Sequence, residues 1–405
     1  MTNRAPLGVL LLSALANACS EGAEPPSPFD GVEALGEALF HDANLSKNRT
    51  QACATCHDPE HAFVDARLDR AGSSSAVSLG DDGVSLGVRN APTVAYASFS
   101  PPFHYGVRER HNKQRQNRRY EGALGGQFLD GRAADLEAQA GGPFVNPLEM
   151  GMPDEASVVA RVLENPAYRS ALPHLFGERV LDGDAEAFAA ITRSIAAFER
   201  TERFAPFDAR YDRSLRGELA LSYKELGGKA LFFSQFTNCS LCHQLHGEGD
   251  PTKERQEPFS GFEFHNLGVP ANEEVRAQSG VTSTDLGLFG QPAASGASER
   301  GKFKTPTLRN VAVTGPYTHN GVFRELRTVL EFYDHHNQPE LRARNPETGE
   351  PWASPEVPET VAIDLLEVGD PLSDTQLEEL ECFLRALTDA RFEHLLDTSV
   401  DCSDG

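Results

Sequence analysis

QACATCHDPEHAF, residues 51–63, contains two cysteines three positions apart and a histidine directly after the second. The same spacing returns in NCSLCHQ, residues 238–244, although the chain of 405 residues has only seven cysteines. Two thiols at this spacing can form thioether bonds to the two vinyl groups of one porphyrin, and the following histidine can bind its iron. The pattern therefore predicts two covalently bound c-type haems.

The two motifs assign roles to six side chains. The attaching cysteines are Cys53 and Cys56 in the first motif and Cys239 and Cys242 in the second, and the proximal iron ligands are His57 and His243. A C-x-x-C pair alone also fits a redox disulfide or half of a zinc site. Zinc stays the alternative, although the motifs lie far apart in the chain and paired structural zinc ligands are usually closer in sequence.

The N-terminus has a charged start at Arg4, a short apolar run and small residues before Cys19. This order is typical of a secretory signal and is too short for a membrane span. We expect residues 1–18 to be a signal peptide and residues 19–29 a flexible tether. Cys19 would then be the lipidated first residue of a membrane-attached periplasmic lipoprotein; ordinary cleavage after Ala18 is the alternative.

The chain is strongly acidic. It has 37 Lys and Arg against 60 Asp and Glu, a formal net charge of −23. Such a chain repels phosphate backbones, which excludes nucleic acid as a partner, and a lipid anchor is the only membrane contact we expect. A basic partner is compatible with this charge, but acidity that only maintains solubility explains it equally well.

Two cysteines, Cys382 and Cys402, remain after the haem motifs and Cys19. In an oxidising compartment they are able to form a disulfide that ties the C-terminal tail to the last helix. Two unpaired thiols are the alternative.

The periodicity of apolar residues predicts an all-α fold. Residues 31–42, 184–202 and 373–389 each place apolar side chains on one helical face. Long segments rich in Gly and Pro, at 72–92, 247–300 and 338–360, are expected to be loops around a cofactor.

A coarse repeat suggests how the chain is divided. LGEALFHDANLSKNRTQACATCH (35–57) and LGGKALFFSQFTNCSLCH (226–243) share a helix that ends in an aromatic residue, a short loop and a haem motif. The expected architecture is two cytochrome c-like domains with long loops, each around one covalently bound haem. Their boundaries are 30–205 and 206–395, and residues 396–405 form a tail.

Five further motifs occur in an ordered series. They are LGEALFHDANLS (35–46), GVRNAPTV (87–94), FLDGRAADLEAQAGGPFVNPLEM (128–150), KTPTLRNVAVTGPYTHNG (304–321) and VLEFY (329–333). Over roughly residues 30–395 the chain resembles the bacterial di-haem cytochrome c peroxidase family, which includes the MauG-type enzymes.

The resemblance implies a peroxidatic first haem, the one bound by His57. Gln139, Pro143 and Glu149 match the family residues on its distal side, where a carboxylate can move a proton between the oxygens of hydrogen peroxide. Read from spacing alone, Glu149 fits a solvated loop equally well. Where many members have a releasable histidine ligand this chain has Asp82, so we expect an open first site, with His104 or His111 as the only substitutes.

The second haem is expected to differ from that of the peroxidases. Tyr333 stands where peroxidases have a methionine ligand and MauG-type members a tyrosine. A packed Tyr333, with the iron left five-coordinate or bound by His335 or His336, is the alternative. The resemblance also implies a calcium ion between the domains, bound by Asn90, Thr314 and Pro316, whose oxygen atoms suit this cation; the alternative is that these are turn residues.

Two features depart from the family pattern. Leu129 stands where the family has a tryptophan between the haems, and leucine cannot be oxidised. Residues 104–122 form an insertion with six Lys or Arg between 108 and 119. We expect a solvated loop there; a docking patch for an acidic redox partner or anionic lipid is the alternative.

The leading hypothesis is a peroxidase that reduces hydrogen peroxide to water with electrons from a small exported cytochrome c or cupredoxin. The alternative is a MauG-type oxidase, which uses peroxide to oxidise residues of a partner protein. A third hypothesis is a non-catalytic di-haem electron carrier. Tyr333 favours the second hypothesis and Leu129 weakens it.

Overall fold

The computed structural model describes residues 1, 28–68, 76–110, 119–243, 256–294 and 296–404. The predicted signal peptide, Cys19 and most of the tether lie outside these residues. None of the helices within the described ranges has the length and apolar content that a membrane crossing requires.

The described chain consists mainly of short helices joined by long connections. The helices are α1 (Val32–Phe40), α2 (Cys53–Cys56), α3 (Leu136–Val145), α4 (Glu155–Val162), α5 (Pro166–Phe176), α6 (Asp184–Glu199), α7 (Arg210–Leu215), α8 (Tyr223–Phe232), α9 (Glu273–Ser279), α10 (Leu326–His335), α11 (Ile363–Leu366) and α12 (Asp374–Arg385). The strands are β1 (His104–Glu109), β2 (Arg119–Leu124), β3 (Phe264–His265) and β4 (Phe303–Lys304). The three predicted amphipathic helices correspond to α1, α6 and α12, whereas α9 lies in a segment that we expected to be loop.

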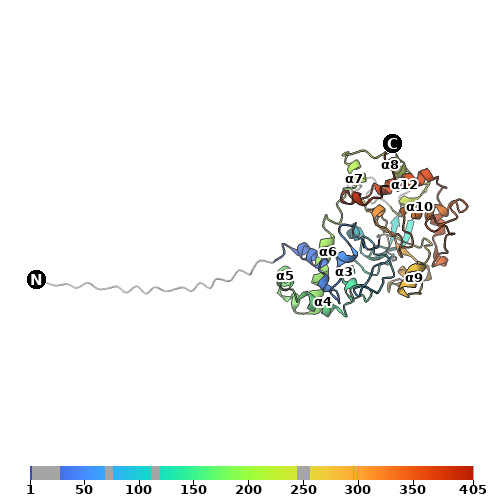
Figure 1. The fold of residues 1–405 in the computed structure, drawn as a ribbon. Helices are drawn as coiled ribbons and strands as arrows, with labels where there is room; N and C mark the ends of the chain where they lie inside the picture. Colours follow the sequence, from blue (N-terminus) through green and yellow to red (C-terminus); the bar gives the residue numbers. More distant parts are fainter. Residues whose placement is uncertain (2–27, 69–75, 111–118, 244–255, 295, 405) are drawn as a thin grey trace.

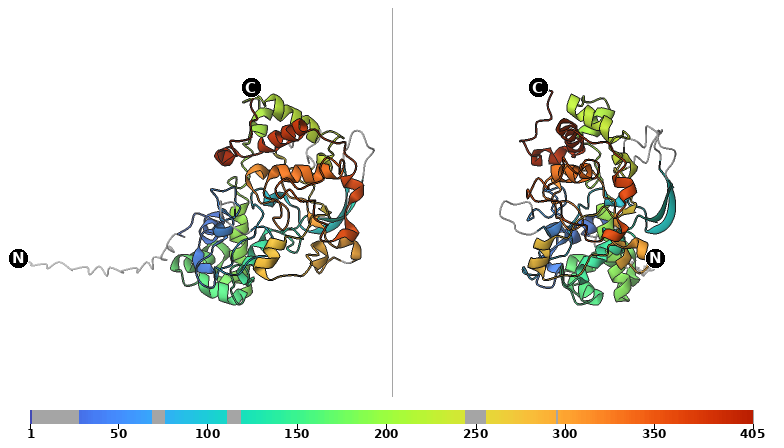
Figure 2. Two further views of the ribbon diagram at one scale, coloured as in Figure 1. Left: turned by 45° about the vertical axis from the view of Figure 1, so that its right-hand side comes forward. Right: turned by 90° about the vertical axis from the view of Figure 1, so that its right-hand side faces the viewer.

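Two large apolar clusters form the interior. The first gathers residues of α1 and α3 to α6, and the second gathers residues of α8, α10 and α12. Figure 1 shows these two groups of helices in separate parts of the molecule, and both views of Figure 2 agree. Each cluster includes a cysteine of one haem motif, Cys53 in the first and Cys239 in the second.

The same helix contact recurs in both halves. Gly36 of α1 lies so close to α6 that an added Cβ would be 1.9 Å from the carbonyl oxygen of Ser194. Gly228 of α8 lies equally close to α12, where an added Cβ would be 1.8 Å from the carbonyl oxygen of Glu379. Only glycine permits such close packing, and both glycines precede an Ala-Leu-Phe sequence, so the repeat in the sequence corresponds to a repeat in the packing.

The described chain is rich in helices, as predicted, and it also contains short strands that the prediction of an all-α fold did not include. β1 and β2 form an antiparallel hairpin from the insertion that we expected to be a solvated loop, and β3 pairs with β4. Arg108 of β1 and Arg110, directly after the strand, face inward, whereas Tyr105 and Val107 are exposed. This arrangement reverses the usual rule that apolar strand residues face the interior, and Figure 2 shows the hairpin at the edge of the molecule.

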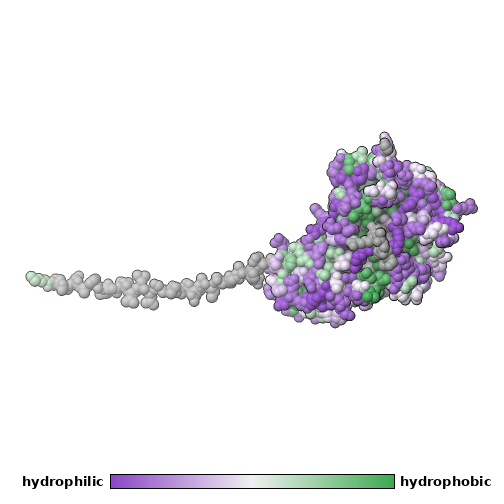
Figure 3. Space-filling model, viewed as in Figure 1, coloured by the Kyte–Doolittle hydropathy of each residue, from purple (hydrophilic) through white to green (hydrophobic). Residues whose placement is uncertain are grey.

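The C-terminal tail is fastened to the second half. Cys382 of α12 forms a disulfide with Cys402, which agrees with the pairing we expected. The Lys224 ammonium of α8 donates to the Asp401 carbonyl (2.7 Å), so the tail also contacts α8. The face of the molecule drawn in Figure 3 is mostly hydrophilic with scattered apolar patches, in line with the acidic composition.

Candidate functional site

The first haem motif forms the short helix α2, and His57 follows it directly. The Nδ1 atom of His57 lies 3.2 Å from the Phe63 carbonyl oxygen, which leaves Nε2 free to bind a metal. Burial lowers the pKa of His57, so the imidazole is neutral, as an iron ligand must be.

The second motif repeats this arrangement. Cys239 begins a 3-10 turn, Cys239–Leu241, and His243 follows it. The Nδ1 atom of His243 lies 2.9 Å from the Phe259 carbonyl oxygen, and burial lowers the pKa of His243 to about 4. The four motif cysteines form no disulfide, as thioether attachment requires.

A cavity of about 400 Å³ lies beside the second motif. Its lining includes Cys239, Cys242 and His243, as well as apolar side chains of α8, α10 and α12. A mostly apolar chamber whose wall carries the His243 imidazole and the two motif thiols fits a covalently bound haem. The chemistry of the lining therefore suits the second haem.

Tyr333 lines the same cavity, whereas neither His335 nor His336 does. The Tyr333 residue is 37 % exposed, because its ring faces the cavity. His335 instead places Nδ1 2.8 Å from the Arg342 carbonyl oxygen. Of the three ligands considered for the second iron, Tyr333 is the one whose position suits that role.

The predicted distal residues of the first haem come from α3 and the turn that follows it. Gln139 and Pro143 are four residues apart on α3 and so share a face. The Met150 amide donates to the Pro143 carbonyl (3.2 Å), which folds the segment containing Glu149 back onto the end of α3.

Glu149 is placed to act as a proton-transfer group. Its carboxylate accepts a hydrogen bond from the Asn146 amide (2.9 Å) and interacts electrostatically with Cys53 and Cys56. Burial raises the pKa of Glu149, which makes it a better proton carrier near neutral pH than a solvated carboxylate. This environment argues against a solvated loop position.

Asp82 lies on the surface, where its carboxylate accepts hydrogen bonds from Ser85 and from the Val84 amide. These contacts lower the pKa of Asp82 to about 2. It is therefore held away from the interior as an anion. The prediction that the first site lacks a sixth protein ligand is unchanged by this placement.

The three predicted calcium ligands all belong to residues of the cavity lining. The cavity lining includes Asn90, Thr314 and Pro316, and the Asn90 side-chain amide donates to the Pro316 carbonyl. A half-turn about the last side-chain bond of an asparagine exchanges the positions of its amide oxygen and nitrogen. In the turned rotamer the side-chain oxygen of Asn90 would face the carbonyl oxygen of Pro316. A bound cation would stabilise two oxygens in this arrangement, so the site fits calcium.

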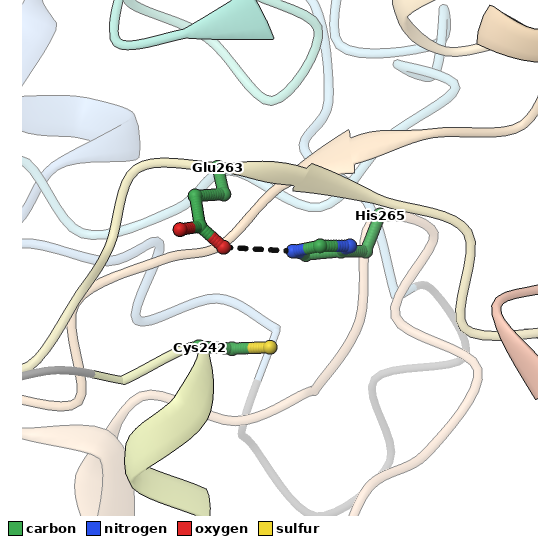
Figure 4. Close-up of side chains that lie close together, drawn as sticks. All are labelled: Cys242, Glu263 and His265. Carbon is green, nitrogen blue, oxygen red and sulfur yellow. Dashed lines mark hydrogen bonds and ion pairs between the residues drawn. The ribbon is translucent and has the colours of Figure 1, made fainter. Parts of the chain in front are cut away.

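A separate group of possible metal ligands lies beside the second motif. Cys242, Glu263 and His265 have ligand atoms within 4.8 Å of one another, and Figure 4 shows Glu263 bonded to His265 above the Cys242 sulfur. Arg110 donates to Glu263 at 2.6 Å and already neutralises this carboxylate. A second cation would be repelled there, and no cysteine of the first motif belongs to the group, so zinc shared between the motifs is not supported.

The sequence did not single out two cations, Arg110, which is buried, and Lys304, which is partly buried. Arg110 is 4 % exposed, and its position became clear only when the hairpin paired. Lys304 lines the cavity, donates to Ser100 Oγ (3.3 Å), and has a pKa lowered to about 7 by burial. Its signal in the sequence was its position at the start of the KTPTLRN motif.

Comparisons with known proteins identify the family of this chain. A family model described as di-haem cytochrome c peroxidase matches residues 31–220. The methylamine utilization protein MauG of Paracoccus denitrificans is 46 % identical over 98 % of this chain and 97 % of its own length. The chain belongs to the di-haem cytochrome c peroxidase and MauG family.

Further members of the family are similar over most of the chain. The cytochrome c peroxidase Ccp of Escherichia coli is 32 % identical over 71 % of this chain and 50 % of its own length. The crystal structure of the di-haem peroxidase BthA from Burkholderia thailandensis matches 92 % of this chain and 90 % of its own, with a TM-score of 0.74 and 27 % identity. The chain is therefore a haem-containing oxidoreductase of the peroxidase type.

Proposed function

We propose that this protein is a MauG-type oxidase that uses hydrogen peroxide to oxidise residues of a partner protein. The observation that carries the proposal is Tyr333 in the cavity of the second haem motif. An anionic oxygen ligand stabilises more oxidised iron, whereas the methionine of an electron-accepting haem raises the reduction potential. The similarity to MauG over nearly the whole chain supports the same choice, so this alternative replaces the peroxidase as our leading hypothesis.

The first haem is the proposed site of peroxide binding. Cys53 and Cys56 would attach it and His57 would bind its iron, which supplies the redox chemistry. Glu149 would take a proton from one peroxide oxygen and return it to the other, so that water leaves. Gln139 would orient the peroxide, and Pro143 would keep the wall rigid.

We propose that a calcium ion fixes the positions of the two haem sites relative to each other. Its ligands would be Asn90, Thr314 and Pro316. Asn90 follows Arg89, which pairs with both Asp130 and Asp285 at 2.6 to 2.7 Å. These contacts already join distant segments of the chain, and a cation beside them would add a further link between the same segments.

A peroxidase remains the second candidate, because relatives that cover most of the chain are named cytochrome c peroxidases. In that function a small exported cytochrome c or cupredoxin would supply electrons through the haem bound by His243. A periplasmic location and a lipid anchor at Cys19 are proposed for either function.

The test uses the haem-containing protein from a host that matures c-type cytochromes. One equivalent of peroxide should change the absorbance at once, and proteins encoded beside its gene should then gain a peroxide-dependent mass change and restore the resting spectrum. Reduced cytochrome c should restore it more slowly. Rapid multiple turnover with reduced cytochrome c, and no modified protein, would favour the peroxidase.

A further inference from the structure

Tyr96 lies between the two halves of the molecule. It packs in the first apolar cluster with Phe63 and Phe204, and it also lines the cavity of the second haem motif. The hydroxyl of Thr93, three residues earlier, donates to the Ala62 carbonyl (2.6 Å), beside the Phe63 carbonyl that His57 contacts. Tyr96 is 1 % exposed, so it is shielded from water and from external reductants.

The hydroxyl partner of Tyr96 distinguishes it from the other tyrosines of the cavity. Three of the eight tyrosines line the cavity, namely Tyr96, Tyr317 and Tyr333. Tyr317 donates to the Val311 carbonyl, which cannot take up its proton. Tyr96 donates to the Asp389 carboxylate at 2.5 Å, and a carboxylate can accept the proton when the ring loses an electron.

Asp389 is held in place for this role. Its second carboxylate oxygen accepts from the Asn310 amide (2.8 Å), and its own backbone amide donates to Asn310 Oδ1 (2.8 Å). Burial raises the pKa of Asp389 to about 6, which leaves it ionised at neutral pH but more basic than an exposed carboxylate.

A buried cation determines which oxidised form of Tyr96 is stable. The Arg309 guanidinium lies 5.5 Å from the centre of the Tyr96 ring and is paired with Asp212 at 2.6 Å. A positive charge at this distance disfavours a positively charged ring. Loss of the electron must therefore be accompanied by loss of the proton.

We propose that Tyr96 is a redox relay between the two haem sites. One electron leaves the Tyr96 ring to meet the oxidising equivalent that peroxide supplies at the first haem. The phenolic O–H bond breaks, and the proton forms an O–H bond with Asp389, which leaves a neutral tyrosyl radical and a neutral carboxyl group. The tyrosyl radical then takes an electron from the second haem site or from the substrate that is being oxidised. The proton returns from Asp389 to the phenolic oxygen, which restores the tyrosine and the carboxylate.

The inference rests on the proposed peroxide chemistry, because the oxidising equivalent comes from that reaction. Leu129 lines the same cavity and cannot be oxidised. The only tryptophan of the chain, Trp352, donates to the Arg342 carbonyl (2.7 Å) and is not part of the cavity wall. Tyr96 is therefore the oxidisable side chain whose position fits the relay.

The test is freeze-quench electron paramagnetic resonance after one equivalent of peroxide is added to the haem-containing protein. Wild type should give a tyrosyl signal that narrows when the protein carries ring-deuterated tyrosine. Tyr96→Phe should lose this signal and keep the resting haem absorbance. Asp389→Asn, which keeps a hydrogen-bond acceptor but no carboxylate, should form the radical roughly a hundredfold more slowly, the contribution of a positioned proton acceptor.

Tyr168→Phe is the matched control, because Tyr168 is also buried and donates to a carboxylate, that of Asp42, but lies outside the cavity wall. It should keep the full signal. A Tyr96→Phe signal equal to that of wild type, or a wild type that reacts with peroxide without a tyrosyl radical, would overturn the relay alone. A wild type whose absorbance peroxide leaves unchanged would overturn the proposed function as well. If Tyr96→Phe does not fold, the narrowing of the signal by deuterated tyrosine and the rate of radical formation in Asp389→Asn test the relay instead.

Discussion

Glu199, at the end of α6, is a buried carboxyl group near Cys53. It is 4 % exposed, its Oε2 atom has no hydrogen-bond partner among the described residues, and burial raises its pKa to about 8. The folded protein therefore keeps a proton that the unfolded chain releases above about pH 4.5. The stability that this proton provides is complete below that pH and is lost as the pH rises to about 8.

We predict that Glu199→Gln makes the protein more stable than wild type at pH 9 and nearly equal to it at pH 4.5. The difference in the free energy of unfolding at pH 9 is expected to reach about 5 kcal/mol, since each tenfold change in an acid constant corresponds to about 1.4 kcal/mol. Denaturant unfolding at both pH values measures it. Glu202→Gln, at a nearby exposed position, is the control and should change neither value; equal curves for wild type and Glu199→Gln would contradict the prediction.

At Glu149 we predict a kinetic effect. Glu149→Gln should keep the resting haem absorbance but react with peroxide roughly a hundredfold more slowly, because the proton carrier is lost. Stopped-flow absorbance measures the rate. Glu155→Gln, an exposed residue at the start of α4, should react like wild type, and a normal rate for Glu149→Gln would remove this residue from the proposed site.

Motif residues were the most predictable part of the site. The haem motifs depend on local spacing alone, so Cys53, Cys56 and His57 could be assigned without a structure. Tyr96 could not, because its role depends on Asp389, which is distant in the chain and meets it only in the folded molecule. Residues that gain their properties from such pairs leave no local signal.

At the scale of elements, regular amphipathic helices were predictable and the hairpin was not. The helices α1, α6 and α12 each bury a continuous apolar face, so their apolar residues recur with the 3.6-residue period of a helix. The side chains that face inward from β1 and from the position directly after it are those of Arg108 and Arg110. The alternation of apolar and polar residues therefore predicts the wrong inward face. Partners on β3 and the segment before it stabilise these arginines, and no local rule predicts them.

The hairpin contact predicts a large cost for breaking one ion pair. Arg110 and Glu263 are both buried and bonded at 2.6 Å. We predict that Arg110→Ala lowers the free energy of unfolding by about 3 to 5 kcal/mol, because it leaves a buried charge without a partner. Denaturant unfolding measures this change.

Replacing both residues with Met should recover much of the stability, because no buried charge is then left. Arg119→Ala is the control, since the Arg119 side chain is 59 % exposed and its pair with Glu121 is 3.9 Å long. It should change stability by less than about 1 kcal/mol. An Arg110→Ala protein as stable as Arg119→Ala would show that the hairpin does not stabilise the second half.

At the scale of the whole molecule, the proposed calcium site connects segments from both halves. We predict that a chelator lowers the melting temperature and changes the absorbance of the haems, and that added calcium reverses both effects. Magnesium, which needs a more regular shell of oxygens, should not. Asn90→Ala should abolish the response to chelator, whereas a chelator response unchanged in Asn90→Ala would place the ion elsewhere.

The disulfide between Cys382 and Cys402 has a consequence for how the protein is made. Four thiols must stay reduced until porphyrin is attached, while two others, in the same compartment, must be oxidised. The second motif and the disulfide lie in the same half of the molecule, because α8 leads into Cys239 and packs against α12. Biogenesis thus requires an order of events, in which premature oxidation of Cys239 and Cys242 would yield a folded but colourless second half.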